Sequence, residues 1–228
     1  MARRRASTHS QQQKITSQRN RARNLHWLRI GGLILIVAGG LAVLGFYRSS
    51  TAPKVDAPLD LMAANIDGPV DAPVRIVEFG DFGCPSCRAW HNSGIKEALK
   101  SEFGEQISFT FRHFPVITRQ SPKAAEAGQC ASEQSRFWEY HDFIYEMTPI
   151  NALSVEQLKG YAASIGLDSD QFNQCLDSGK YQSYVARDQQ AAFSAGAAGT
   201  PTFFINGRIS SFSYEGMLSA IVQLLGQS

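Results

Sequence analysis

Two cysteines three positions apart, Cys84 and Cys87, constrain the fold of this chain more than any other feature of the sequence. They come shortly after residues 74–79, a mostly β-branched run that predicts a buried strand. They open residues 84–103, which we expect to form one helix, with Pro85 in the first turn, where its missing N–H is harmless. A helix N-terminus stabilises a thiolate on the first cysteine, and this spacing brings the second within reach of a disulfide.

This placement predicts a redox-active cysteine pair. We expect Cys84 to be the exposed nucleophile and leaving group, and Cys87 to be the more buried partner that resolves the mixed disulfide. Half of a zinc site and an inert structural disulfide are the two alternatives. The remaining cysteines, Cys130 and Cys175, are 45 residues apart, and no pair of histidines has metal-ligand spacing. We therefore expect no metal at this site.

The order of the expected elements predicts an α/β fold with a helical insertion. A strand over residues 106–111 completes a βαβ unit with the first strand and the helix, and such a unit needs parallel strands. The pattern is helical over residues 121–195, where Ser154 and Gln157 have the spacing of a capping box, and the α/β pattern then resumes. The last expected elements are a strand over 201–205, a type I′ turn at Asn206-Gly207, a returning strand over 208–212 and a helix over 214–225.

A proline stands at the start of the expected hairpin, directly after Thr200. A proline in such a turn often follows a cis peptide bond, so we expect the Thr200–Pro201 bond to be cis. The predicted fold turns this bond toward the helix start that carries Cys84. The alternative is an ordinary proline that opens a strand.

The chain resembles the thioredoxin superfamily in two motifs that lie far apart, VEFGDFGCPSC and GTPTFFING, and in the order of its elements. The helical insertion is similar to that of the DsbA-like thiol:disulfide oxidoreductases of bacterial envelopes. The resemblance covers about residues 62–226. It implies that Cys84 and Cys87 form the redox pair, and that Thr200 and Pro201 line the substrate groove.

The resemblance implies an enzyme without a cofactor that forms disulfides in exported proteins through its own dithiol. A quinone-linked integral membrane protein would reoxidise it, and the absence of a dimerisation domain before the redox domain predicts a monomer. Glu78 matches a buried acid that assists proton transfer, the alternative being a surface carboxylate. Pro85 and Ser86 tune the redox potential, and Ser86 departs from the Pro-His of the best-known strong oxidase. A membrane-tethered reductase or isomerase and a non-catalytic peptide-binding chaperone module are therefore the alternatives.

The resemblance also bears on the other cysteines. Cys130 and Cys175 fall in the insertion, the cysteine count is even, and similar pairs occur in some DsbA-like proteins. We therefore expect a Cys130–Cys175 disulfide that staples the insertion, the alternative being two buried free thiols. We expect Phe82, just before the redox pair, to be exposed near the groove, where an apolar side chain suits the binding of unfolded polypeptide.

The N-terminal part of the chain predicts a membrane anchor. Residues 30–47 carry no charge, and with Trp27 and Leu28 before them the segment over 27–47, in which Arg29 is the one charged residue, is long enough to cross a bilayer. Residues 1–48 hold nine basic and no acidic side chains, so the positive-inside bias puts the N-terminus in the cytoplasm. The alternative is a cleaved secretory signal.

These assignments divide the chain into a basic cytoplasmic tail, a transmembrane anchor, a linker and one domain, at residues 1–26, 27–47, 48–60 and 61–228, with the helical insertion at about 120–196. The domain then lies on the outer, periplasmic side of the cytoplasmic membrane, where disulfides persist. After residue 48 the chain carries 13 basic and 20 acidic side chains. Because the positive charge belongs to the tail and not to the domain, we expect no nucleic-acid partner.

Overall fold

The computed structural model describes residues 65–150 and 152–226. The predicted tail, transmembrane anchor and linker lie outside the described residues. Within residues 65–150 and 152–226, no helix combines the length and the apolar character that a membrane span needs.

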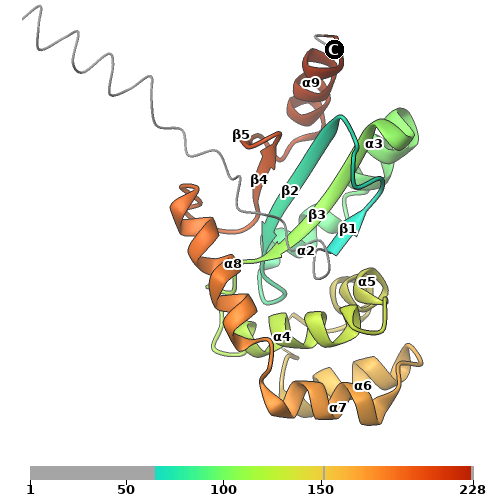
Figure 1. Ribbon diagram of the computed structural model, residues 1–228, viewed down its shortest axis with the longest axis vertical. Coiled ribbons are helices and arrows are strands. Elements are labelled where there is room, and N and C mark those ends of the chain that lie inside the picture. Colours follow the sequence, from blue (N-terminus) through green and yellow to red (C-terminus); the bar gives the residue numbers. More distant parts are fainter. Residues whose placement is uncertain (1–64, 151, 227–228) are drawn as a thin grey trace, which may run out of the picture. The chain divides into compact units, whose positions relative to one another are not determined.

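A five-stranded sheet in the order β1-β3-β2-β4-β5 forms the centre of the domain (Figure 1). β2 and β3 are parallel and the other neighbours are antiparallel, so the predicted βαβ unit is confirmed. β1 pairs along the outer edge of β3, and the sequence patterns did not predict it. The strands are β1 (Asn65–Asp67), β2 (Val74–Gly80), β3 (Ile107–His113), β4 (Thr202–Ile205) and β5 (Arg208–Ser210).

The prediction of one helix over residues 84–103 is wrong, because the structure contains two helices there. α2 (Pro85–His91) ends at Asn92, and α3 (Ile95–Phe103) begins after Gly94. Gly94 has a φ of 72°, in the left-handed region that glycine adopts without strain, and this turns the chain between the two helices. α3 ends at Gly104, as predicted, and the short 3-10 helix η1 (Gly104–Gln106) leads into β3.

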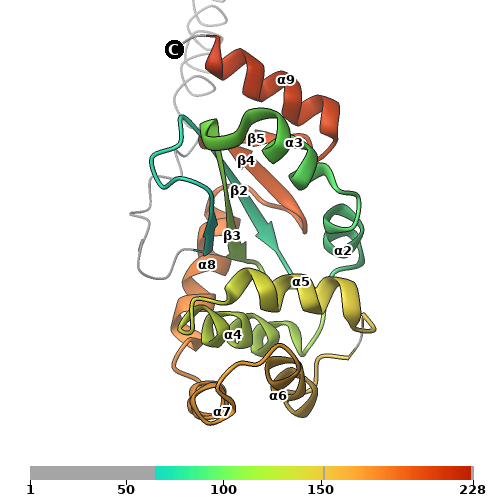
Figure 2. The same ribbon diagram turned by 90° about the vertical axis from the view of Figure 1, so that its right-hand side faces the viewer.

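Helices cover both faces of the sheet (Figure 2). Figure 2 shows α2, α3 and α9 (Tyr214–Leu225) on one side of the sheet, and α8 (Gln182–Ser194) on the other. Alternate strand residues point to opposite faces. Phe203 therefore joins the hydrophobic core beneath α2, α3 and α9, while its neighbour Phe204 joins the core beneath α8.

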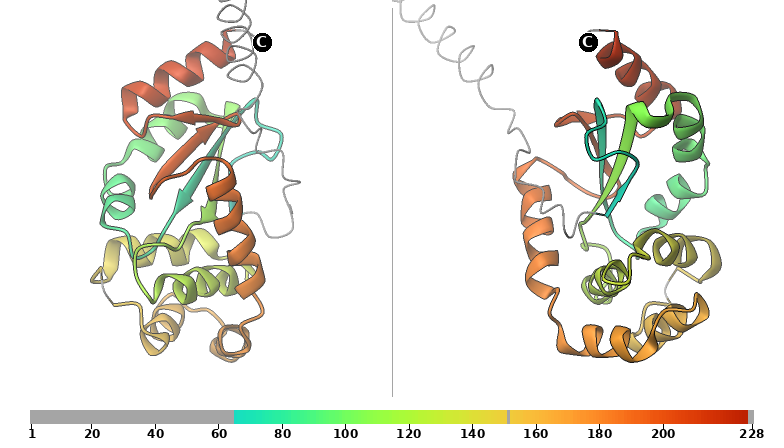
Figure 3. Two further views of the ribbon diagram at one scale, coloured as in Figure 1. Left: turned by 90° about the vertical axis from the view of Figure 1, so that its left-hand side faces the viewer. Right: turned by 45° about the vertical axis from the view of Figure 1, so that its right-hand side comes forward.

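The helical insertion lies between β3 and β4 in the sequence; its first four helices pack at one end of the sheet, and its last, α8, runs back along one face (Figures 1 and 3). Its third helix begins with the predicted capping box: the Ser154 side chain accepts the backbone N–H of Gln157, and the Gln157 side chain accepts the backbone N–H of Ser154. The hydrophobic cluster at its centre includes Tyr140 and Phe172, both fully buried. Its helices are α4 (Ser121–Ser132), α5 (Phe137–Met147), α6 (Val155–Ser164), α7 (Ser169–Ser178) and α8.

The β4–β5 hairpin turns at Asn206 and Gly207, whose φ angles of 45° and 77° are both positive, as the predicted type I′ turn requires. The described residues thus have the thioredoxin-like α/β fold with a helical insertion that the sequence predicts.

Candidate functional site

The two cysteines lie where β2 leads into α2. Cys84 is the N-cap residue of α2, Pro85 occupies the first turn, and Cys87 lies one turn further along. The Cys87 backbone N–H donates to Cys84 Sγ, with 3.5 Å between nitrogen and sulfur, and both cysteines are free thiols. The helix N-terminus therefore presents unpaired N–H groups to the sulfur of Cys84.

The cis Thr200–Pro201 peptide bond lies against this sulfur. The Thr200 carbonyl oxygen is 3.3 Å from Cys84 Sγ, although the two residues are 116 positions apart in the sequence. Cys84 was expected to be exposed, and this is wrong, because only 3% of the residue is accessible to solvent. The exposed residues of the motif are Pro85 and Ser86.

The two sulfurs have opposite acidities. A hydrogen bond from the Cys87 thiol is the main cause that lowers the pKa of Cys84 to about 5; burial opposes the shift, and contacts with Thr200 and the Ser86 and Cys87 backbones assist it. Burial raises the pKa of Cys87 well above its ordinary value, and the neighbouring Cys84 and Glu78 raise it further. At neutral pH the site therefore holds one thiolate, on Cys84, and one thiol.

Glu78 lies in β2 and is buried, so the alternative of a surface carboxylate is wrong. Burial raises the pKa of Glu78 to about 8; Lys96 opposes this shift and Cys84 adds to it. Within the described residues, Glu78 Oε1 has no hydrogen-bond partner. The side chain is therefore a neutral acid at pH 7 that interacts electrostatically with the cysteines and has a free oxygen.

Asp81, three residues before Cys84, organises the loops around the site. Its carboxylate accepts the backbone N–H groups of Gly83 at 2.7 Å and of Val116 and Ile117 at 2.8 Å each. Its backbone carbonyl accepts the N–H of Cys84 at 2.9 Å. Sequence reasoning missed this residue; the signal available was an Asp two positions before Gly83, a spacing typical of side-chain-capped turns.

The loop that Asp81 holds carries the exposed apolar side chains near the site. Val116 is 40% exposed and Ile117 is 46% exposed. Phe82, which was expected to play this part, is buried and stacks on Phe111 with 5.6 Å between ring centroids, so that expectation is wrong. The Phe82 ring instead packs against rings of α5 in the insertion, those of Phe137, His141 and Tyr145.

The structure joins Cys130 of α4 to Cys175 of α7 in a disulfide, with 5.8 Å between their Cα atoms. The bond links two helices of the insertion through its hydrophobic cluster, so the alternative of two free thiols does not describe this structure.

This arrangement suits thiol–disulfide exchange. Cys84 is a stabilised thiolate, which makes it a nucleophile and a good leaving group, and Cys87 is a protonated thiol in contact with it. Glu78 is a buried acid that interacts electrostatically with both sulfurs.

Comparisons with known proteins agree with this chemistry. The family model described as Thioredoxin matches residues 64–223. The probable disulfide bond formation protein D of Bacillus cereus is 31% identical over 204 residues, which cover 82% of this chain and 90% of that protein. The crystal structure of oxidised BdbD from Bacillus subtilis has a TM-score of 0.65 and 25% sequence identity, and the match covers 73% of this chain and 95% of that chain.

Another curated relative is a larger protein. The Na(+)/H(+) antiporter NhaA of Herminiimonas arsenicoxydans is 38% identical over 169 residues, which cover 74% of this chain and 26% of that protein. This chain thus spans about a quarter of the length of that relative. The family match, the relative of similar length and the redox geometry agree: the chain belongs to the thioredoxin family and is similar to its DsbA-like disulfide oxidoreductases.

Proposed function

We propose that the protein is an oxidase that forms disulfides in exported proteins. The observation that carries this proposal is the contrast between the two thiols, with the pKa of Cys84 lowered to about 5 and that of Cys87 raised. A stabilised Cys84 thiolate stabilises the reduced form of the protein. The disulfide form is then the stronger oxidant, because its reduction releases that stabilisation.

The reaction begins with the Cys84–Cys87 disulfide. A substrate thiolate attacks Cys84 Sγ, the bond between the two cysteine sulfurs breaks, and Cys87 leaves as a thiolate that takes up a proton. The second substrate thiolate then attacks the substrate sulfur of the mixed disulfide, and Cys84 leaves as a thiolate. Two electrons pass from the substrate dithiol to the protein, and the substrate gains one disulfide.

Glu78 supplies the proton that Cys87 takes up in this scheme. Cys87 has a raised pKa, so its thiolate is a strong base that needs a proton as it leaves. Glu78 is neutral at pH 7 and has an oxygen without a hydrogen-bond partner among the described residues. A buried acid with a pKa near 8 both gives and regains a proton near neutral pH.

Unfolded substrate chains bind across the Thr200–Pro201 turn and the exposed Val116 and Ile117. The turn contacts the Cys84 sulfur and so places a bound chain beside it, while the two apolar side chains suit unfolded polypeptide.

For the location of the protein we propose a single-pass anchor in the cytoplasmic membrane over residues 27–47, with the domain outside and a quinone-linked membrane protein as its reoxidant. The charge distribution of the N-terminal sequence supports this orientation. A membrane-impermeant maleimide should label the reduced Cys84 in spheroplasts, and alkaline carbonate should not extract the protein. Labelling that requires lysis would contradict the proposed topology.

The redox potential of the Cys84–Cys87 couple, measured against glutathione, tests the direction of the reaction. We expect a value well above that of thioredoxin, in the range of about −120 to −180 mV that oxidases and isomerases occupy. Alkylation of Cys84 should also follow a titration near pH 5. A potential near about −270 mV would make the protein a reductase instead.

A further inference from the structure

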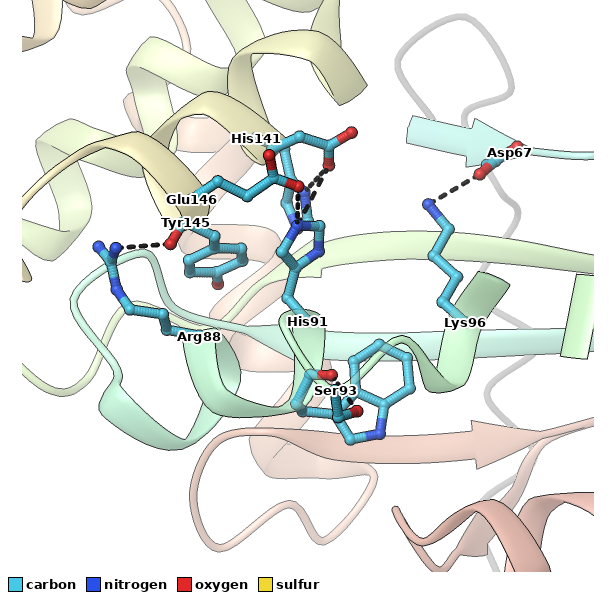
Figure 4. A network of polar contacts seen from close by, with 10 residues as sticks. Asp67, Arg88, His91, Ser93, Lys96, His141, Tyr145 and Glu146 are labelled. Atoms are coloured by element: carbon cyan, nitrogen blue, oxygen red, sulfur yellow. Dashed lines mark hydrogen bonds and ion pairs between the residues drawn. The ribbon is translucent and has the colours of Figure 1, made fainter. Parts of the chain in front are cut away.

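A second cluster of reactive side chains lies between α2 and α5, apart from the cysteines. His91 is the last residue of α2, and His141, Asp142 and Glu146 come from α5. Figure 4 shows His141 and Glu146 directed toward the ring of His91. His91 Nε2 lies 3.2 Å from Glu146 Oε1 and 3.9 Å from Asp142 Oδ1, and His141 Nδ1 lies 2.8 Å from Asp142 Oδ1. The ligand-type atoms of the two histidines and Asp142 all lie within 4.8 Å of one another.

We propose that this cluster binds one divalent transition-metal ion of the zinc class, with His91, His141 and Asp142 as ligands and Glu146 as the fourth. Two imidazole nitrogens with carboxylate oxygens are a ligand set that Zn²⁺ takes in proteins, at distances of about 2.0–2.2 Å. Ca²⁺ and Mg²⁺ are bound mainly by oxygen, so the two histidines disfavour them.

The ligand atoms of His91, His141 and Asp142 are close enough together to share one ion, and the exposed side chain of Glu146, which contacts His91, must turn toward it to complete a tetrahedron. Bonds of about 2.1 Å at tetrahedral angles place ligand atoms roughly 3.4 Å apart. The distances of 3.2 Å and 3.9 Å from His91 Nε2 lie on either side of that value. The 2.8 Å contact between His141 and Asp142 is a hydrogen bond, and it lengthens by roughly half an ångström when a metal ion replaces the shared proton.

The surroundings hold the ligands in place and leave an entrance for the ion. The side chains of His91 and His141 are 8% and 2% exposed, whereas those of Asp142 and Glu146 are 43% and 55% exposed. The ring of Tyr145, 4.6 Å from that of His141, fixes its orientation. An ion therefore enters between the two carboxylates and meets the histidines behind them.

The bound ion would join the helix that carries the redox pair to the helical insertion. His91 lies four residues after Cys87, on the same face of α2, and its partners belong to α5. No sequence spacing reveals the site, because His91 and His141 are 50 residues apart. The proposal does not depend on the direction of the redox reaction.

Titration of the purified full-length chain with Zn²⁺ tests the proposal. The chain is first oxidised, so that the Cys84–Cys87 disulfide is closed and the thiols cannot bind the metal. We expect one equivalent of Zn²⁺ to bind and to raise the melting temperature, because the ion binds the folded state. Co²⁺ at the same site should give visible d–d absorption without the charge-transfer band of a thiolate ligand.

Three variants locate the ion. Asp142→Asn and His91→Gln should each weaken Zn²⁺ binding by about tenfold or more, since even an outer hydrogen-bonding partner of a metal site is often worth that much. Glu139→Gln is the matched control, because Glu139 lies on the same helix with a side chain that is also 55% exposed, and it should bind like the parent. His9 and His26 are present in every variant, so their contribution cancels.

The proposal is overturned if the oxidised chain binds no Zn²⁺, if Ca²⁺ binds equally well, or if Asp142→Asn and His91→Gln bind Zn²⁺ like the parent. Circular dichroism confirms that each variant is folded. If His91→Gln does not fold, Asp142→Asn alone tests the proposal. Asp142 is half-exposed and Asn has nearly the same size, so this variant should fold.

Discussion

Cys84 and Cys87 lie in the same hydrophobic cluster as Cys130 and Cys175, and all four residues are buried. The first two are free thiols of opposite acidity, whereas the other two form a disulfide. Burial is therefore common to the two pairs and does not explain their difference.

The difference lies in the backbone around each sulfur. Cys84 is an N-cap residue whose sulfur meets N–H groups that have no partner within the helix. Cys130 and Cys175 lie inside α4 and α7, where the helices use those groups themselves. A sulfur at a helix start is thus stabilised as a thiolate, whereas a sulfur within a helix lacks these donors and is stabilised by forming a disulfide.

The largest effect should come from removing the sulfur at the helix start. Cys84→Ser should abolish oxidation of reduced substrate proteins, because no other thiolate at the site can attack or leave. Cys87→Ser should instead trap a mixed disulfide when Cys84 attacks a disulfide-bonded substrate: one substrate sulfur leaves as a thiolate, and no Cys87 thiol is present to displace the other from Cys84. Oxidative refolding of a reduced test protein measures the first variant, and non-reducing electrophoresis detects the trapped species of the second. If Cys84→Ser kept the oxidative refolding activity of the wild type, the domain would act as a non-catalytic peptide-binding module and not as an oxidase.

Removing the other pair should affect stability and leave the chemistry intact. The double variant Cys130→Ala/Cys175→Ala opens a loop of 45 residues, which should lower the free energy of unfolding by about 3–4 kcal/mol. Urea unfolding of the oxidised protein measures this loss. The redox potential of the Cys84–Cys87 couple should stay the same at temperatures where the variant is folded. A large change in that potential would show that the two pairs are coupled through their shared cluster.

Replacement of the buried acid sharpens the comparison, because it should change chemistry and stability in opposite directions. Glu78→Gln should slow thiol exchange by about 100-fold, the contribution of a positioned acid. The pKa of Glu78 is about 8 in the folded state, above its ordinary value of 4.5. The contribution of Glu78 to the free energy of unfolding is therefore complete below pH 4.5 and is lost as the pH rises through 8. Glu78→Gln should remove that loss.

Stopped-flow exchange rates and urea unfolding between pH 4 and 9 test both parts of this prediction. Glu105→Gln is the control, because Glu105 is exposed and should change neither quantity. If Glu78→Gln shows the same decline in stability with pH as the parent, the buried acid is not the group that titrates.

The smallest effect should come from the loop scaffold. Asp81→Asn puts an amide donor among backbone N–H groups, and loss of these charge-assisted bonds should cost about 1–3 kcal/mol of stability. The KM for an unfolded substrate should rise more than kcat falls, because the Val116–Ile117 loop is held less firmly. Asp177→Asn, at an exposed ion pair with Lys159, should change neither. A lower kcat with unchanged KM would place Asp81 in the chemical step.

Sequence patterns predicted those parts of the molecule that depend on local chemistry. The strand before Cys84, the capping box at Ser154 and the turn at Asn206-Gly207 each follow from a few neighbouring residues. The patterns failed where distant residues decide. β1 is three residues long and exists through its pairing with β3, and Asp81 acquires its role from a loop 35 residues away.

The exposure of single side chains was the least predictable property. Cys84 is covered by a turn 116 residues later in the sequence, and Phe82 is enclosed by rings that include Phe111. The break between α2 and α3 at Gly94 also escaped prediction, since the apolar pattern continues across it. Helical periodicity in a sequence indicates which face of a helix is buried, but it does not indicate whether one helix or two carry the pattern.

The antiparallel pairing of β2 with β4 has a consequence for the time course of folding. Ile76 pairs with Ile205, so the sheet is completed only after the whole insertion has been synthesised. Contacts between such distant segments form slowly, because a long loop must close first. A chain that appears N-terminus first presents Cys84, Cys87 and Cys130 before Cys175. During that interval the partner that Cys130 needs is absent and two competing thiols are present, so correct pairing depends on the order of events and not on the final structure alone.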